Sequence, residues 1–447
     1  MWFPISLSLV DLMSKSRLSG WGGYPKLILD LINIRNEKHL KKIIPSIGNF
    51  ITRGNGRSYG DSSLSSTCVS NIQNNKILEF DDKTGVIRCE SGILLSEIIE
   101  IFVPRGWFLK VTPGTKLVTV GGAIAGDVHG KNHHKDGCFS TSLIEIRLML
   151  SDGSIVNCSQ QKHKELFLAT CGGMGLTGII LEATFSLKSI LSQNIKQTTI
   201  KTKNLHQTFD AFEKYADATY SVAWIDCLSK GDTIGRSLLM TGEFSDDGDL
   251  EYSSKKAVSV PFNFPSIVLN YFSVKLFNAL YYFKAKQGVS HQNVGLDSFF
   301  FPLDSVGSWN RIYGRNGFVQ YQFILPKKES LEGLTKILEK ISDIGLGSFL
   351  AVLKLYGKEN ENYLSFPMEG YSLALDFKIQ KGLFNFLKEL DQIVLEYNGR
   401  IYLAKDSRVG KSVFEKGYPN IERFREFRKS QGMKEKFTSL QSERLGL

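Results

Sequence analysis

Residues 1–190 combine short apolar alternations with helical spacing, separated by glycine-rich turns. Segments 76–82 and 85–92 alternate apolar and polar side chains, which predicts two strands around a turn. Residues 94–107 have apolar side chains at helical spacing up to a proline, and 142–159 form two apolar runs around an Asp-Gly dipeptide typical of a hairpin. The pattern therefore predicts an α+β domain over residues 1–190.

Beyond residue 190, glycine becomes rarer and aromatic side chains become more frequent. Five stretches there alternate like strands of an antiparallel sheet, namely 221–228, 236–244, 317–326, 349–357 and 371–379. Residues 330–345 and 382–399 have helical spacing and are expected to cover that sheet. We predict a second α+β domain with an antiparallel sheet over residues 191–398.

Residues 255–288 form an insert within this second domain that is rich in Phe, Tyr and Leu and carries lysines at both ends. Two interpretations are open. The insert is either a buried helical segment, or else a mobile lid or a lipid-facing surface, because aromatics beside lysines suit an interface with anionic lipid.

A first glycine cluster follows a predicted strand in "RGNGRSYGD", with Gly54, Gly56 and Gly60. Its spacing is GxGxxxG, whereas a dinucleotide fold has GxGxxG opening a helix, so a nicotinamide site is not expected. The backbone N–H groups of such a turn can bind phosphate, and Arg53 and Arg57 could add charge. Taken alone, the cluster is equally consistent with a plain turn.

A second cluster, "GGAIAGDVHGKNHHKDG" at residues 121–137, mixes glycines with His129, His133 and His134. The small side chains indicate a loop that lies close to a flat or charged ligand. A metal site would need the histidines on a regular helix, and Gly130 and neighbouring polar residues argue against one. We therefore predict no metal site here.

Composition narrows the function classes. The chain has 447 residues, with 55 Lys and Arg against 45 Asp and Glu, a net charge of +10. Such a surplus favours anionic partners, but no basic stripe or zinc knuckle supports nucleic-acid binding. The six cysteines form no CxxC pair, so a disulfide scaffold is not expected, and they are expected to be buried or semi-buried small residues. The N-terminus lacks the features of a signal peptide, and no stretch predicts a transmembrane helix.

A third cluster, "GGMGLTGII" at residues 172–180, completes a pattern far more specific than any single motif. With it, the first 190 residues resemble the FAD domain of the vanillyl-alcohol oxidase / p-cresol methylhydroxylase (PCMH) superfamily, in which two lobes enclose an extended FAD. From residue 17 onward, "FPLDSVGSWNRIYG", "LSFPMEGYSLALDF" and "GRIYLAKDSR" are similar to the branch that oxidises polyprenyl-phosphate-linked pentoses.

The resemblance implies roles for individual residues. FAD contacts are expected from Thr52, Arg53, Gly54, Asn55, Gly56, Arg57, Ser58, Tyr59, Gly60, Asp61, Ser62, Gly114, Thr119, Val120, Gly121, Gly122, His129, Ile180 and Tyr402. Substrate contacts are expected from Tyr59, Lys131, Trp224, Phe301, Gln320, Gln322 and Lys354. Residues 399–447 are expected to return to the FAD domain, so that Tyr402 and Lys405 reach the flavin.

Lys405 falls where the family has its essential lysine. A cation there would stabilise negative charge on the reduced flavin, and it could also orient or help deprotonate the sugar hydroxyl. Arg57 stands where many superfamily members have the histidine that bonds to flavin, so the resemblance implies non-covalent FAD. Phe301, Ser372, Ala374 and Gly126 depart from the mycobacterial pattern and leave the sugar substrate open.

The expected function is oxidation of the 2′-hydroxyl of a polyprenyl-phosphate-linked ribose to a 2-keto sugar, the first half of an epimerisation. A separate NAD(P)H-dependent reductase would be the partner. The expected location is cytoplasmic, at the inner face of the cell membrane. The alternative is an aldonolactone or alditol oxidase, similar to D-arabinono-1,4-lactone oxidase, that acts on a soluble sugar.

Overall fold

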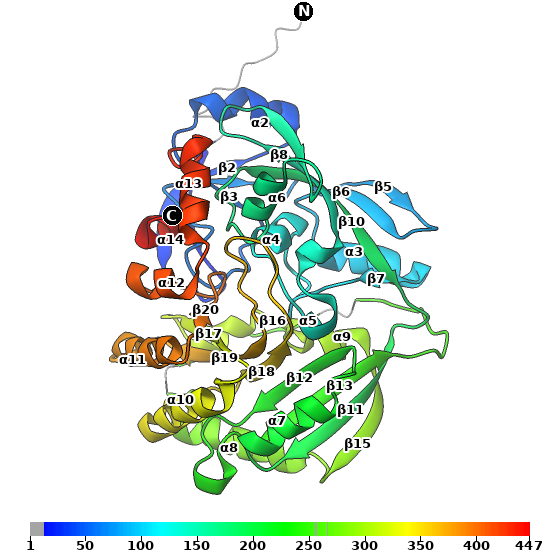
Figure 1. Cartoon of the computed structure of the whole chain (residues 1–447), viewed down its shortest axis with the longest axis vertical. Coiled ribbons are helices and arrows are strands. Elements are labelled where there is room, and N and C mark those ends of the chain that lie inside the picture. The colour runs from blue at the N-terminus through cyan, green and yellow to red at the C-terminus, as the bar shows by residue number, and fades with distance from the viewer. Residues whose placement is uncertain (1–12, 255–256, 266) are drawn as a thin grey trace, which may run out of the picture.

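A computed structural model describes residues 13–254, 257–265 and 267–447. The chain forms two lobes, one built on two sheets from the N-terminal half and the other on a single large sheet (Figure 1). Helices and strands are mixed in both lobes, which confirms the predicted α+β class. The first twelve residues and residues 255, 256 and 266, on which the signal-peptide prediction and part of the predicted insert fall, lie outside the described residues.

The first lobe holds a four-stranded and a six-stranded sheet. The first has the order β1 (Met13–Ser19), β2 (Lys26–Asn33), β4 (Thr67–Ser70), β3 (Ile51–Arg53), and the second has β5 (Ile77–Asp81), β6 (Val86–Glu90), β10 (Ile179–Ser189), β8 (Leu143–Met149), β9 (Ile155–Cys158), with β7 (Trp107–Leu109) also paired to β10. Its helices are α2 (Glu37–Ile43), α3 (Leu95–Phe102), α4 (Val120–Ala125), α5 (His133–Asp136) and α6 (Lys164–Thr170).

The second lobe is an eight-stranded antiparallel sheet with helices around it. The strand order is β15 (Val289–Gly295), β11 (Asn194–Thr202), β13 (Ser237–Phe244), β12 (Tyr220–Ile225), β18 (Ala351–Tyr356), β19 (Gly370–Lys378), β17 (Phe318–Pro326), β20 (Arg400–Ile401). The helices are α7 (Leu205–Lys214), α8 (Tyr271–Lys284), α9 (Leu296–Phe300), α10 (Ser330–Ile344) and α11 (Leu383–Glu396), and β14 (Val258–Ser259) pairs with β16 (Val306–Gly307). All five predicted strands and both predicted helices are present.

The large sheet has two different faces because successive side chains of a strand point to opposite sides. One face packs against α7, α10 and α11, whose apolar stripes are buried on it. The other face carries polar side chains such as Gln320 and Gln322 and turns toward the first lobe. The sheet thus supplies one wall of the space between the lobes.

Part of the second glycine cluster is a helix, α4, where the sequence predicted a loop. Thr119 caps it, because its Oγ1 accepts a hydrogen bond from the Gly122 N–H at 3.1 Å. Val120, Ala123 and Ile124 are buried on the core side. This burial outweighs the low helix propensity of two glycines in so short a helix.

Residues 399–447 cross from one lobe to the other. They first add β20 to the edge of the large sheet, and then run through α12 (Lys411–Gly417), α13 (Ile421–Ser430) and α14 (Leu440–Leu445) beside the N-terminal strands (Figure 1). The Thr438 N–H donates to the Phe50 carbonyl at 2.9 Å, and the Leu440 N–H donates to the Leu64 carbonyl at 2.8 Å. The end of the chain is therefore part of the first lobe's structure.

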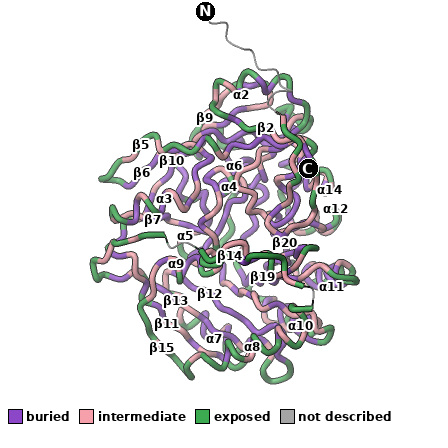
Figure 2. The backbone as a smooth tube through the Cα atoms, turned by 180° about the vertical axis from the view of Figure 1, so that it is seen from behind, coloured by how far each residue is buried: buried purple, intermediate pink, exposed green. Residues whose placement is uncertain are grey.

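The insert at 255–288 contains helix α8, which has one buried face and several exposed apolar side chains. The tube in Figure 2 marks much of this end of the second lobe as exposed.

All six cysteines are buried and unpaired, as predicted. Within the described ranges, no helix is long and apolar enough to cross a membrane.

Candidate active site

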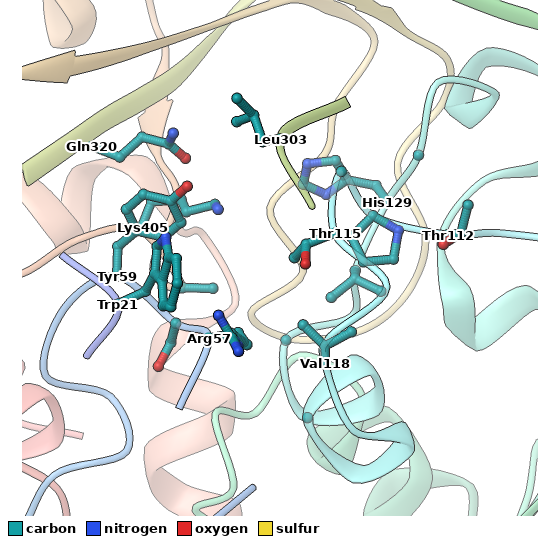
Figure 3. Close-up of a pocket in the computed structure, with 18 of the residues that line it drawn as sticks. Trp21, Arg57, Tyr59, Thr112, Thr115, Val118, His129, Leu303, Gln320 and Lys405 are labelled. Atoms are coloured by element: carbon teal, nitrogen blue, oxygen red, sulfur yellow. The ribbon is translucent and has the colours of Figure 1, made fainter. Parts of the chain in front are cut away.

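A cavity of about 590 Å³ lies between the two lobes and is lined by both. This volume falls in the range of ligand-binding pockets. Figure 3 shows Lys405, Tyr59, Trp21 and Arg57 on one side and Thr115, Val118 and His129 on the other, with Gln320 and Leu303 beside them. Glycines and small polar side chains form the first-lobe wall, and the large sheet forms the second.

The first glycine loop, residues 54–62, is held in place by contacts from behind. Gly56 has φ +61°, which suits glycine, and a Cβ there would lie 2.1 Å from Arg53 Nη2. The Arg53 guanidinium donates to the Ser19 carbonyl at 2.8 Å and to Ser63 Oγ at 3.1 Å. Arg53 therefore braces the loop from outside the cavity, and Arg57 lies at the cavity with its guanidinium 4.2 Å from the centre of the Trp21 ring.

The second wall segment, residues 113–122, is fixed by carboxylates of the second lobe. Asp304 accepts hydrogen bonds from Thr115 Oγ1 and from the Lys116 N–H, both at 2.8 Å. Lys116 Nζ pairs with Asp297 at 2.7 Å. These contacts hold the loop before α4 against the second lobe and close one end of the cavity.

Strand register explains which side chains of the sheet reach the cavity. Gln320 is paired with Asp376, and Gln322 is paired with Ala374. Lys354 is paired with Ser372 on the other side of β19. Since paired residues of neighbouring strands share a face, β17, β18 and β19 present one polar surface to the cavity.

Lys405 follows β20 at the junction of the two lobes. Its backbone N–H donates to the Tyr402 carbonyl at 3.1 Å, and the preceding residue, Ala404, accepts from the Tyr59 N–H at 3.0 Å. Its Nζ lies 3.7 Å from the centre of the Tyr59 ring, a close cation–π contact. Loss of water around Nζ lowers the pKa of Lys405, and the carboxylate of Asp376 opposes that shift.

Asp376 on β19 is a buried carboxyl group that sequence reasoning missed. Its Oδ1 accepts from Gln320 Nε2 at 2.6 Å, and its Oδ2 accepts from the Tyr313 hydroxyl at 3.4 Å. Burial raises the pKa of Asp376, while Gln320 and Lys405 oppose the shift. The sequence did contain an indication of its position, because Ser372, Ala374 and Asp376 are spaced two apart in a predicted strand and therefore share one face.

Two further lysines line the cavity. Lys131 Nζ donates to the Phe299 carbonyl, and burial, with Lys354 second, lowers its pKa to about 7. Burial lowers the pKa of Lys354 to about 8, and its Nζ makes no hydrogen bond or ion pair with the described part of the chain. Lys131 and Lys354 thus form a side of the cavity that is cationic when they are protonated, and an anionic ligand would stabilise that charged state.

His129 is buried among aromatic rings, with the Tyr356 and Tyr402 ring centres both 4.9 Å from its own. Burial and nearby Lys354 hold its pKa well below the usual range, so the imidazole is neutral. Its Nε2 lies 3.5 Å from Gln322 Nε2, and Nδ1 is buried with no hydrogen-bond partner among the residues that the structure describes. A cavity ligand could supply that missing hydrogen bond.

The other polar residues of the second glycine cluster have structural partners. Asp127 accepts from Asn360 and Asn362 at 2.8 Å and from Ser365 at 2.7 Å. His133 Nδ1 accepts from the Gly357 N–H at 3.1 Å. His134 Nε2 lies 2.8 Å from a backbone carbonyl. No group of three or more metal-ligand side chains occurs in residues 13–254, 257–265 and 267–447.

The cavity brings together most of the residues predicted to bind cofactor or substrate. Those that line it are Thr52, Gly54, Asn55, Gly56, Arg57, Ser58, Tyr59, Ser62, Gly114, Thr119, Gly121, Gly122, His129, Lys131, Ile180, Trp224, Gln320, Gln322, Lys354, Tyr402 and Lys405. Those outside its lining are Arg53, Gly60, Asp61, Val120 and Phe301. Phe301 is packed in the core, and its neighbours Phe299 and Phe300 line the cavity.

This chain is similar to known proteins over most of its length. Residues 32–159 match the family model of an FAD binding domain. Decaprenylphosphoryl-β-D-ribose oxidase of Mycolicibacterium smegmatis is 34% identical over 96% of this chain and 97% of that protein. The chain belongs to the decaprenylphosphoryl-β-D-ribose oxidase family. It is therefore an FAD-dependent oxidoreductase.

Shorter similarities extend to other enzymes. Mouse L-gulonolactone oxidase is 30% identical over 25% of this chain and 25% of that protein. Human Δ(24)-sterol reductase is 33% identical over 24% of this chain and 21% of that protein. These matches cover only part of either chain.

The polar lining of the cavity fits FAD, and this observation does not depend on sequence similarity. Four buried polar atoms on lining residues have no hydrogen-bond partner in the described part of the chain: Thr52 Oγ1, Arg57 Nε, Thr112 Oγ1 and His129 Nδ1. Buried polar atoms are normally hydrogen-bonded, so a polar ligand is expected to satisfy them. Glycines beside them leave room for its close approach.

Proposed function

We propose that this protein oxidises the 2′-hydroxyl of a polyprenyl-phosphate-linked ribose to a 2-keto sugar, as the first half of an epimerisation. The observation that carries the proposal is the 34% identity to decaprenylphosphoryl-β-D-ribose oxidase over almost the full length of both chains. The cationic side of the cavity supports it, because a phosphorylated substrate would pair with Lys131 or Lys354.

Lys405 acts as the catalytic residue in this proposal. Oxidation of a secondary alcohol removes a hydride from carbon, which FAD would accept when bound, and a proton from oxygen, which would pass to water. The Lys405 ammonium stabilises the negative charge that develops during this transfer. Asp376 is a positioning residue, because its carboxylate raises the proton affinity of Lys405 Nζ and anchors Gln320.

The remaining predicted contacts divide between the two ligands. The loops around Gly54–Ser62 and Thr119–Gly122 bind FAD by backbone N–H groups and small side chains, together with His129 and Tyr402. Gln320, Gln322 and Trp224 hold the sugar on the sheet side. These assignments rest on the family resemblance and on the position of each residue at the cavity.

FAD is bound without a covalent link in this proposal. Arg57 has no nucleophilic ring nitrogen, and its guanidinium lies over Trp21. We expect acid precipitation to release all the yellow colour into the supernatant. Colour that stays in the pellet would contradict non-covalent binding.

Two partners complete the proposed reaction. A separate NAD(P)H-dependent reductase would reduce the keto sugar from the opposite face, and the lipid part of the substrate would keep this protein at the inner face of the cell membrane, on the cytoplasmic side. Mixing the FAD-loaded protein and its substrate with an electron acceptor that reoxidises the flavin, the reductase and NAD(P)H is expected to convert the ribose to the arabinose epimer.

The alternative function is oxidation of a soluble aldonolactone or alditol, which the partial match to L-gulonolactone oxidase favours. The two functions are separated by turnover with an artificial electron acceptor. We expect turnover with polyprenyl-phosphoryl-ribose and none with aldonolactones at equal concentration. The reverse result would replace the proposed function by the alternative.

A further inference from the structure

Helix α8 has an exposed apolar face at the mouth of the cavity. Phe272, Leu276, Leu280 and Phe283 follow each other at helical spacing, and their exposed fractions are 78%, 61%, 63% and 65%. Ile267, just before the helix, is 77% exposed. A contiguous apolar surface of this kind is unusual on a protein that does not dock on anything.

The helix is firmly attached to the second lobe by its opposite face. Val274, Asn278 and Tyr282 are buried at the same helical spacing. Asn278 Nδ2 donates to Asp226 Oδ1 at 2.9 Å, and the Tyr282 hydroxyl donates to the Thr202 carbonyl at 2.9 Å. The exposed face is therefore held outward by packing and hydrogen bonds.

The charged side chains that this segment itself carries are of one sign. The sequence from 257 to 288 contains three lysines, Lys275, Lys284 and Lys286, and no Asp or Glu. All three are exposed. Lys201 and Arg236 lie 5.6 and 5.3 Å from the centre of the Phe283 ring, and Arg236 is paired with the buried Asp226. Apolar side chains beside cations complement an anionic lipid surface, whereas two such faces would repel each other in a dimer.

The same helix forms part of the cavity wall. Phe277 and Tyr281 line the cavity and are 44% and 40% exposed. Tyr281 contacts Trp224, with ring centres 4.8 Å apart, and Phe277 contacts Phe349 at 5.6 Å. The cavity thus reaches the surface beside α8.

We propose that Phe272, Leu276, Leu280 and Phe283 insert into an anionic lipid bilayer, which brings the cavity mouth at Phe277 and Tyr281 to the membrane surface. If the proposed function holds, on which this second part rests, a lipid-linked substrate enters the cavity along α8 with its chain still in the bilayer. The membrane contact itself needs no substrate.

The test is sedimentation of the FAD-loaded protein with vesicles that contain no substrate. We expect the protein to bind vesicles of phosphatidylcholine with phosphatidylglycerol, and to bind pure phosphatidylcholine vesicles more weakly. Leu276→Glu and Leu280→Glu are each expected to lower the partition coefficient about tenfold or more, because each places a charge where the exposed leucine would enter the bilayer. Leu191→Glu is the control, since Leu191 is 65% exposed but lies outside α8.

Thermal melting and flavin absorbance confirm that each variant is folded. Absence of vesicle binding by the wild-type protein would overturn the proposal, as would equal binding by the α8 and Leu191 variants. A wild-type dimer that the α8 substitutions convert to a monomer, without vesicle binding, would instead identify a second copy as the occupant. Since these vesicles carry no substrate, failure here is distinct from failure of the proposed catalytic function.

Discussion

At the scale of single residues, the proposed mechanism depends on a lysine ammonium held beside a buried carboxyl group. Lys405→Met removes the charge and keeps most of the side-chain volume, so we expect kcat to fall by about 100-fold or more. The flavin absorbance of the purified variant is expected to stay unchanged. Lys416→Met, on an exposed part of α12, is the matched control. Full turnover by the Lys405 variant would remove this residue from the mechanism.

The Asp376 carboxylate opposes the loss of the proton from Lys405. Asp376→Asn removes that negative charge, and the pKa of Lys405 falls further below its ordinary value. Because the protonated lysine is the active form in the proposed mechanism, activity is expected to be lost as pH rises through this pKa. The basic limb of the kcat profile is therefore expected at lower pH in the variant, and an unshifted or upward-shifted limb would contradict the role of Asp376.

The sequence identified Gln320 and Gln322 as neighbours on one strand face, because period two is a local property. It did not identify Asp376, whose partner Gln320 lies 56 positions away in the sequence and is brought close only by the pairing of β17 with β19. Phe301 was predicted to contact substrate but does not line the cavity. The packing of α9 turns Phe299 and Phe300 toward the cavity instead.

At the scale of elements, the first glycine loop is pressed against the chain that carries Lys405. A Cβ on Gly60 would lie 1.9 Å from the Asp406 carbonyl oxygen, a backbone atom that cannot move aside alone. Gly60→Ala is expected to lower the free energy of unfolding by about 1–3 kcal/mol and to weaken FAD retention. Gly48→Ala, where nothing lies within 4 Å, is the control in urea denaturation. Equal stability of the two variants would show that the loop tolerates displacement.

Strands with strict alternation were predictable because each buries one face. Helix α4 was not predictable, because a short helix with two glycines shows no clear apolar periodicity. Thr119, which caps its N-terminus, was the one indication of a helix in the sequence. The sequence also left undecided whether the apolar face of α8 is buried or exposed, because the same pattern of aromatic residues is compatible with both.

At the scale of the molecule, the last helix fastens the first glycine loop to the returning chain. Arg444 pairs with Asp61 and Asp406, both at 2.9 Å, and both carboxylates are buried. Arg444→Met leaves two buried charges unpaired and is expected to lower the free energy of unfolding by about 3–5 kcal/mol. The exposed pair of Arg423 with Glu165 is the control, and its loss is expected to cost about 0–1 kcal/mol. Similar losses in urea denaturation would contradict this role of α14.

The most direct test of the central claim is anaerobic mixing of the FAD-loaded protein with polyprenyl-phosphoryl-ribose. Oxidation of the 2′-hydroxyl transfers two electrons to the flavin, so the flavin absorption band at about 450 nm is expected to bleach. Soluble aldonolactones are expected to leave the band unchanged. An unchanged band with the lipid-linked sugar, together with bleaching by an aldonolactone, would contradict the proposed function.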